Sequence, residues 1–290
     1  MTNIDNTKTI IGRSTMTQVR FSISQVTSAD GTIIGYRQIG KGPALIIMHG
    51  GLRASQHYER LASALADTFT VYIPDRRGRG LSGPAGDNYS VTKECEDLAA
   101  ILQKTKARMV FGHSGGALFA LEAALKSPID KLVLYEPAVS VNGSLPLAWV
   151  SEFERAVAKK DYAEAMVLLI KGLPLNWMSS MPHWALYPLF SFMLRGKQGS
   201  EIVELLGTGA REAKKSIRLD STHGRYRAIR AETLLLGGAK SPSFLLDVLL
   251  VLADTLPHAQ LMKLPDLDHS APDEDAPEAV AAAFKPFLLN

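Results

Sequence analysis

Residues 109–125 read MVFGHSGGALFALEAAL, in which an apolar strand, a glycine-rich turn and an apolar helix follow one another. The turn, residues 112–116, matches the pattern G-x-S-x-G. Glycines on both sides of Ser114 permit the sharp strand-to-helix turn on which a nucleophilic serine is exposed at the carboxyl edge of a parallel sheet. The segment therefore predicts a nucleophile at Ser114. The alternative is a tight glycine turn in which the serine is incidental.

Short apolar segments alternate with helical patterns on both sides of this turn, which is typical of a parallel sheet covered on both faces. Two antiparallel strands joined by an Asp-Gly turn open the pattern. We predict an α/β fold with an eight-stranded, mostly parallel sheet and helices on both faces. The expected strands are residues 19–26, 33–39, 44–48, 70–73, 109–111, 131–135, 233–236 and 260–264, and the expected helices are residues 54–67, 90–104, 115–127, 241–255 and 275–288.

The stretch from Pro137 to Glu232 is far longer than a crossover helix needs, and it carries several helical patterns. We expect a helical cap inserted after the sixth strand, at residues 140–224. The α/β core would then comprise residues 18–139 and 225–290. Residues 1–17 are polar and rich in threonine, and they read as a loose N-terminal extension.

Composition narrows the class of protein. The 290 residues are 46% hydrophobic and 21% charged, which is close to average globular usage and argues against a disordered, collagen-like or coiled-coil chain. The net charge of +3 is spread along the chain, so nucleic acid is not an expected partner. No apolar run approaches the ~18 residues of a membrane span, and no signal peptide is evident, so we expect a cytoplasmic protein. The single cysteine, Cys95, excludes an intramolecular disulfide and a cysteine-rich zinc site.

A serine hydroxyl needs a neighbouring base, and a tetrahedral intermediate needs donors for its oxyanion. His269 directly follows the last expected strand, so a loop at the same sheet edge could bring its imidazole onto Ser114; alternatively it is a solvated loop histidine. Gly51, after strand 44–48, and Gly115, after the nucleophile, are the expected oxyanion donors through their backbone N–H groups. The alternative for these glycines is a turn without catalytic purpose. His49 is expected to organise its turn by hydrogen bonding.

In order and context, four segments together resemble the α/β-hydrolase superfamily: HGG at residues 49–51, DRRGRGLS at 75–82, GHSGG at 112–116 and finally His269. The resemblance covers nearly the whole chain from about residue 18. It implies the order nucleophile, acid, histidine, and a cap after the sixth strand. It also implies that residues 75–82 form a structural loop, with the alternative that one of its three arginines reaches the substrate.

The acidic member of the expected triad departs from the superfamily pattern. The resemblance implies an aspartate shortly after strand 233–236, but Ser241 stands at that place. A serine can bond to an imidazole, yet it cannot offset the charge of an imidazolium. Glu136 directly follows strand 131–135, where some superfamily members such as certain haloalkane dehalogenases carry their acid, and we predict that it substitutes. The alternative is a structural carboxylate that braces the entry to the cap.

The expected reaction is hydrolysis of a small apolar carboxylic ester through an acyl-enzyme, because a serine nucleophile disfavours epoxide-hydrolase and dehalogenase chemistry. All three tryptophans lie in the cap segment and form either an apolar pocket or the cap's own core. One alternative is carbon–carbon bond hydrolysis or cofactor-free perhydrolysis, which suit the same triad. Another is a weakly active ligand-binding member that lacks a proper acid. No metal or phosphate-binding motif is present, so a small-molecule substrate and no cofactor are expected. The oligomeric state is left open.

Overall fold

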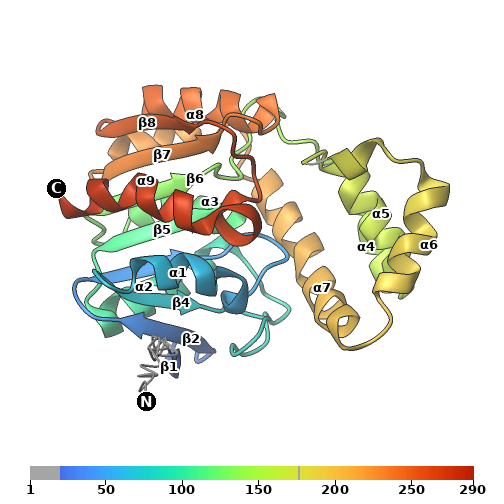
Figure 1. Cartoon of the computed structure of the whole chain (residues 1–290), viewed down its shortest axis with the longest axis horizontal. Coiled ribbons are helices and arrows are strands. Elements are labelled where there is room, and N and C mark those ends of the chain that lie inside the picture. The colour runs from blue at the N-terminus through green and yellow to red at the C-terminus, as the bar shows by residue number, and fades with distance from the viewer. Residues whose placement is uncertain (1–19, 176) are drawn as a thin grey trace, which may run out of the picture.

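One twisted sheet forms the centre of the molecule in the computed structural model, which describes residues 20–175 and 177–290 (Figure 1). Its strand order is β1-β2-β4-β3-β5-β6-β7-β8. β2 runs antiparallel to β1 and β4, and all other neighbours are parallel. This confirms the predicted eight-stranded, mostly parallel sheet. The strands are β1 (Ser22–Thr27), β2 (Ile33–Gly40), β3 (Ala44–Met48), β4 (Thr70–Pro74), β5 (Met109–His113), β6 (Lys131–Tyr135), β7 (Glu232–Gly238) and β8 (Ala259–Leu264).

Helices cover both faces of the sheet, as predicted (Figure 1). One apolar core lies under α2, α3 and α8, and a second lies under α1 and α9. The sequence of β3 is almost continuously apolar because both of its faces are buried. Ile46 packs into the first core, whereas Leu45 and Ile47 pack into the second. The helices of the core are α1 (Glu59–Leu65), which follows a 3₁₀ turn at Ser55–Tyr58, α2 (Val91–Thr105), α3 (Gly115–Ala124), α8 (Ser243–Thr255) and α9 (Pro277–Leu289).

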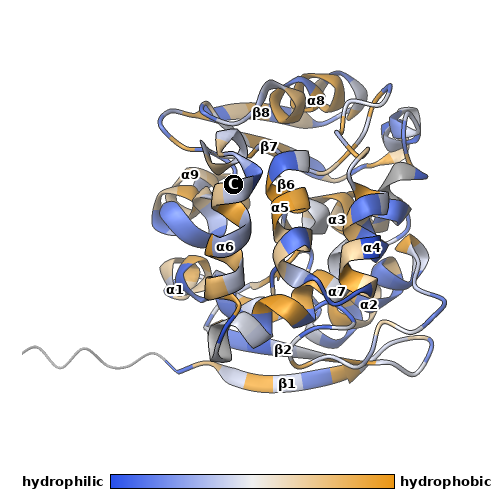
Figure 2. Cartoon of the chain, turned by 90° about the vertical axis from the view of Figure 1, so that its right-hand side faces the viewer, coloured by the Kyte–Doolittle hydropathy of each residue, from blue (hydrophilic) through white to orange (hydrophobic). Residues whose placement is uncertain are grey.

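Four further α-helices lie between β6 and β7 in the described part of the chain, where the sequence predicts a cap. They are α4 (Val150–Ala158), α5 (Tyr162–Gly172), α6 (His183–Met193) and α7 (Lys197–Ile217), and we refer to them as the inserted helices. Figure 1 shows α7 between the sheet and the group of α4, α5 and α6, and Figure 2 views these three helices in front of the core. The boundaries predicted for the cap, residues 140–224, stay a prediction. The predicted extension at residues 1–17 lies outside the described residues.

The aromatic side chains of the inserted segment divide into two groups. Phe153 and Phe190 are fully buried within small apolar clusters of the inserted helices themselves. Trp177, Trp184 and Phe192 are 73–78% exposed. Within residues 20–175 and 177–290, no helix is both long and apolar enough to cross a membrane.

Candidate active site

Ser114 occupies a strained turn between β5 and α3. Its backbone lies at φ 52° and ψ −118°, a region that costs a non-glycine residue about 1–3 kcal/mol. The flanking glycines are required by space: a Cβ on Gly112 would lie 2.5 Å from the Cα of Ala117, and one on Gly116 would collide with backbone carbonyl groups of Met48 and His49. The Ser114 N–H donates to the Tyr135 carbonyl at 2.9 Å. The turn therefore presents Ser114 at the carboxyl edge of the sheet and at the N-terminus of α3.

Glu136 and His269 are in direct contact. Glu136 is completely buried directly after β6, and its Oε2 lies 2.6 Å from Nδ1 of His269. Its Oε1 accepts the backbone N–H of Gly238 at 2.7 Å. Since an ionised carboxylate only accepts hydrogen bonds, the proton of a neutral His269 resides on Nδ1, and Nε2 presents its lone pair. This is the tautomer that a general base for a serine needs.

Ser241 makes no comparable contact. Its backbone N–H donates to the Gly238 carbonyl at 3.0 Å, while its buried Oγ has no hydrogen-bond partner among the described residues. The place that the superfamily pattern gives to an aspartate therefore contributes nothing to His269. The carboxylate that reaches the imidazole comes from β6 instead.

Ser114 and His269 lie in the same neighbourhood without a hydrogen bond between them. The His269 ring centroid is 4.7 Å from that of His113, the residue next to the serine. Among the described residues, the hydrogen bonds of His269 do not include Ser114 Oγ. Such bonds are often long in ligand-free sites and shorten when substrate binds. The pairing of these two residues thus stays a prediction.

Gly51 and Gly115 approach each other closely. A Cβ placed on Gly115 would lie 3.5 Å from the backbone nitrogen of Gly51. The two predicted oxyanion donors are therefore within reach of one small group, beside the predicted nucleophile.

The loop that carries Gly51 is held by two buried histidines. His49 Nδ1–H donates to the Gly50 carbonyl at 2.9 Å, and its Nε2 accepts the backbone N–H of Arg76 at 3.0 Å. The Gly50 N–H donates to the Tyr58 hydroxyl at 3.0 Å, which lies 2.6 Å from Nδ1 of His113. Burial lowers the pKa of both histidines well below the ordinary value, so both stay neutral. The expectation that His49 organises this turn is confirmed, whereas sequence reasoning missed Tyr58.

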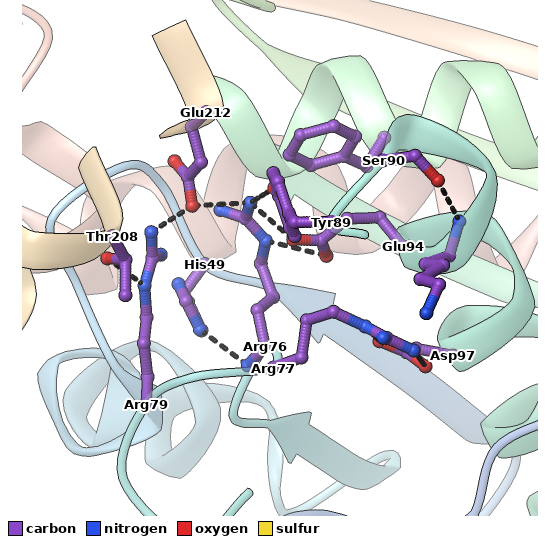
Figure 3. A network of polar contacts seen from close by, with 12 residues as sticks. His49, Arg76, Arg77, Arg79, Tyr89, Ser90, Glu94, Asp97, Thr208 and Glu212 are labelled. Carbon is purple, nitrogen blue, oxygen red and sulfur yellow. Dashed lines mark hydrogen bonds and ion pairs between the residues drawn. The ribbon is translucent and has the colours of Figure 1, made fainter. Parts of the chain in front are cut away.

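A buried ion-pair network, drawn in Figure 3, includes Glu212, whose Oε2 lies 3.4 Å from the position of a Cβ on Gly51. Arg76 donates through Nε and Nη2 to both carboxylate oxygens of Glu94, at 3.0 and 2.9 Å. The same Nη2 donates to Glu212 Oε1 at 2.6 Å, and Arg79 also pairs with Glu212. Although burial acts to raise it, the Arg76 charge holds the pKa of Glu94 below its ordinary value. Burial lowers the pKa of Arg79, and the charge of Arg76 acts in the same direction against the attraction of Glu212.

Arg77, the third arginine of residues 75–82, is held by ion pairs of its own. Its guanidinium donates to both oxygens of Asp97 at 2.7 Å and pairs with Asp30. The sequence predicts a structural role for the three arginines, and all three are indeed buried and paired. Sequence reasoning did not find Glu212, because a glutamate in the middle of the amphipathic helix α7 gives no local signal of its distant partners. Within the described part of the chain, no group of three or more histidine, cysteine or acidic side chains is arranged to hold a metal ion.

A parallel sheet with a strained serine turn at its carboxyl edge, and with a buried carboxylate on a histidine beside it, defines a hydrolase fold. The chain belongs to the alpha/beta hydrolase fold family, which matches residues 43–276. It is 25% identical over 264 residues to the 2-(acetamidomethylene)succinate hydrolase of Mesorhizobium japonicum, which covers 88% of this chain and 91% of that protein.

Solved structures agree with this assignment. An alpha/beta hydrolase from Sphaerobacter thermophilus has a TM-score of 0.77 and 29% identity, covering 91% of this chain and all of that chain. The enol-lactonase from Burkholderia xenovorans has a TM-score of 0.68 at 20% identity, covering 92% and 100% of the two chains, and at this identity it bears on the fold alone. The protein is therefore a hydrolase of this family.

Proposed function

We propose that the protein hydrolyses a carboxylic ester through an acyl-enzyme formed on Ser114. The observation that carries the proposal is the 2.6 Å contact between Glu136 Oε2 and His269 Nδ1, because it leaves Nε2 free to take a proton. The strained backbone of Ser114 supports it further. The relative from Mesorhizobium japonicum is also named a hydrolase.

In the proposed reaction, Ser114 Oγ attacks the ester carbonyl while His269 Nε2 takes its proton. The backbone N–H groups of Gly51 and Gly115 receive the negative charge that develops on the carbonyl oxygen. Collapse of the tetrahedral intermediate expels the alcohol, to which His269 returns the proton. Water, deprotonated by the same imidazole, then releases the acid and frees the serine. Glu136 stabilises the imidazolium in both halves.

The apolar character expected of the substrate has less support than the ester itself. Phe153 and Phe190 fill the interior of the inserted helices, and Trp177 and Trp184 point outward with most of their surface exposed. We therefore propose ester hydrolysis by the Ser114 site without restricting the acyl group to an apolar one.

Covalent labelling by a fluorophosphonate tests the proposal without knowledge of the substrate. We expect labelling of the wild type and none of Ser114→Ala, together with serine-dependent release from p-nitrophenyl acetate or butyrate. Ser241→Ala is the matched control, since that serine is buried near the site without a partner for its hydroxyl. Equal labelling of wild type and Ser114→Ala would refute the proposal.

A further inference from the structure

A carboxylate of the inserted helix α7 lies against the predicted oxyanion donors. Oε2 of Glu212 is 3.4 Å from the position of a Cβ on Gly51 and 3.8 Å from that of a Cβ on Gly115. Its other oxygen is bonded to Arg76 and Arg79 (Figure 3). A negative charge at this place opposes the formation of an oxyanion on the same two glycines. Glu212 must therefore move or be replaced when the ester reacts.

The two arginines are built into the core around this point. Arg76 is clamped by Glu94, and its guanidinium carbon lies 4.4 Å from the centre of the Phe119 ring. Arg79 donates through Nη1 to the backbone carbonyls of Gly50 and Arg53 at 3.3 and 3.4 Å. These contacts fix the cations on the loops that carry the predicted site, independently of Glu212.

One donor of this cluster has no partner. Nη1 of Arg76 is fully buried and unbonded among the described residues, and it lies 3.8 Å from the Cβ position of Gly115. Arg76 itself is 2% exposed. A buried guanidinium N–H without an acceptor is costly, and this one lies beside Gly115, one of the two predicted oxyanion donors. The cluster therefore offers a buried donor to an anionic acceptor beside Gly115.

The charge balance of the cluster also favours an anionic ligand. With Glu212 in place, Arg76 and Arg79 are balanced by Glu94 and Glu212. Withdrawal of Glu212 leaves one buried positive charge in excess beside Gly51 and Gly115. Burial already lowers the pKa of Arg79 with Glu212 present, so the excess charge would demand another anion.

We propose that Arg76 and Arg79 form a subsite for a carboxylate of the substrate's acyl group, which pairs with the two guanidinium groups in place of Glu212 Oε1, while the position of Oε2 beside Gly51 and Gly115 passes to the scissile carbonyl. This inference rests on the proposed function of the Ser114 site and deepens it. Because Glu212 Oε2 lies within 4 Å of both glycine positions, the substrate carboxylate is separated from the scissile carbonyl by only a few bonds. The substrate class is a half-ester of a short dicarboxylic acid. Glu212 excludes water and neutral acyl groups from the subsite until such an anion arrives.

Binding of succinate, the acid product of the simplest such half-ester, tests the subsite without hydrolysis. Titration calorimetry at constant ionic strength is expected to show binding to the wild type, with an affinity at least tenfold higher in Glu212→Gln, where the competing charge is gone. Arg79→Gln is expected to weaken binding at least tenfold. Arg77→Gln is the matched control, because Arg77 is equally buried but pairs with Asp97 and Asp30. Butyramide, which is neutral, should not bind.

Turnover supplies the second readout. Release of acid from methyl hydrogen succinate and from methyl butyrate, followed in a pH-stat, is expected to show at least a tenfold preference in kcat/KM for the half-ester. Arg79→Gln should bring the ratio close to one, whereas Arg77→Gln should preserve it. A network that only fastens α7 to the core would lower both rates alike and leave the ratio unchanged, and that result would overturn the subsite.

The two proposals fail in different ways. If a fluorophosphonate labels Ser114 but succinate binds neither the wild type nor Glu212→Gln, the subsite is wrong and the serine chemistry stands. If succinate binds with the expected dependence on Glu212 and Arg79 but no Ser114-dependent cleavage occurs, the subsite is supported and the ester hydrolysis is refuted. Because Glu212→Gln keeps the side chain's size, the binding test does not depend on an arginine variant folding.

Discussion

Replacement of Glu136 by glutamine alters a single atom of the predicted triad and keeps the size of the side chain. In the present structure, the two carboxylate oxygens each have one donor: Gly238 N–H on Oε1 at 2.7 Å and His269 Nδ1 on Oε2 at 2.6 Å. A glutamine offers only one acceptor oxygen, and its NH₂ group donates. One of the two buried partners must therefore face a donor instead of an acceptor.

The size of the effect on kcat depends on which of the two partners, the Gly238 N–H or His269 Nδ1, loses its acceptor. If the amide oxygen stays on Gly238, the NH₂ group faces His269 Nδ1 and stabilises the tautomer with its proton on Nε2, which cannot accept the proton of Ser114. An equivalent change of tautomer costs about 10⁴ in kcat in a serine protease, or about 5 kcal/mol of activation free energy. If the amide flips instead, the buried Gly238 N–H loses its acceptor at a cost of about 1–3 kcal/mol in stability. The first arrangement is the cheaper one for the fold, so we expect the large kinetic loss.

The assay is the initial rate of p-nitrophenyl butyrate hydrolysis, with the rate of fluorophosphonate labelling as a substrate-independent check. We expect kcat of Glu136→Gln to fall between 10³- and 10⁴-fold, with a thermal unfolding midpoint close to that of the wild type. Ser241→Ala, at the place where the superfamily pattern has its acid, should change kcat less than twofold. An undiminished kcat in Glu136→Gln, or a large loss in Ser241→Ala, would refute the reasoning.

Three further expectations follow from the backbone and the buried groups. Ser114→Gly should abolish activity and raise the free energy of unfolding in urea by about 1 kcal/mol, because glycine relieves the strain at φ 52°; a lower stability would contradict this. Burial holds the pKa of His49 and His113 well below 6.5, so just below pH 6.5 only the unfolded chain binds these protons. The free energy of unfolding should therefore fall by about 1.4 kcal/mol per pH unit for each histidine as the pH decreases below 6.5. His113→Asn, compared with wild type by denaturant titration at pH 7 and 5.5, should lose its share of that slope. Burial, with the nearby acids, raises the pKa of the Cys95 thiol to about 12, so Ellman's reagent at pH 8 should react at least 100-fold more slowly than in the denatured protein, and equal rates would show an accessible thiolate.

The layer architecture could be predicted because its signals are local. β3 and β6 have the bounds that their apolar runs predict, at Ala44–Met48 and Lys131–Tyr135, since strands buried on both faces are continuously apolar. Helix ends were less accurate: the helix expected at residues 115–127 ends at Ala124, because residues 125 and 126 form a turn after it. The α/β fold itself follows from the alternation of these segments.

The candidate site also contains some residues that local sequence signals predict and others that they do not. Ser114 and His269 stand next to strand ends, so their common edge follows from the topology of a parallel sheet. Tyr58 and Glu212 reach the site from helical segments, 56 and 98 positions away from Ser114, and nothing in their immediate sequence marks the face on which they point. The network of Arg76 therefore needed coordinates, although the sequence had left open that one arginine of residues 75–82 reaches the substrate.

The position of Glu136 directly after β6 has a structural counterpart on β7. β6 lies between β5, which carries Ser114, and β7, so a carboxylate after β6 has to extend across the end of β7 toward His269. Gly237 and Gly238 make room for it: a Cβ on Gly237 would lie 3.5 Å from Glu136 Oε1, and the Gly238 N–H is the donor that fixes that oxygen. A glutamate has the length for this path, and the side chain of Glu136 is completely buried there. Because the Nδ1 proton of His269 already has its acceptor from β6, a serine at position 241 leaves no donor of the imidazole unsatisfied.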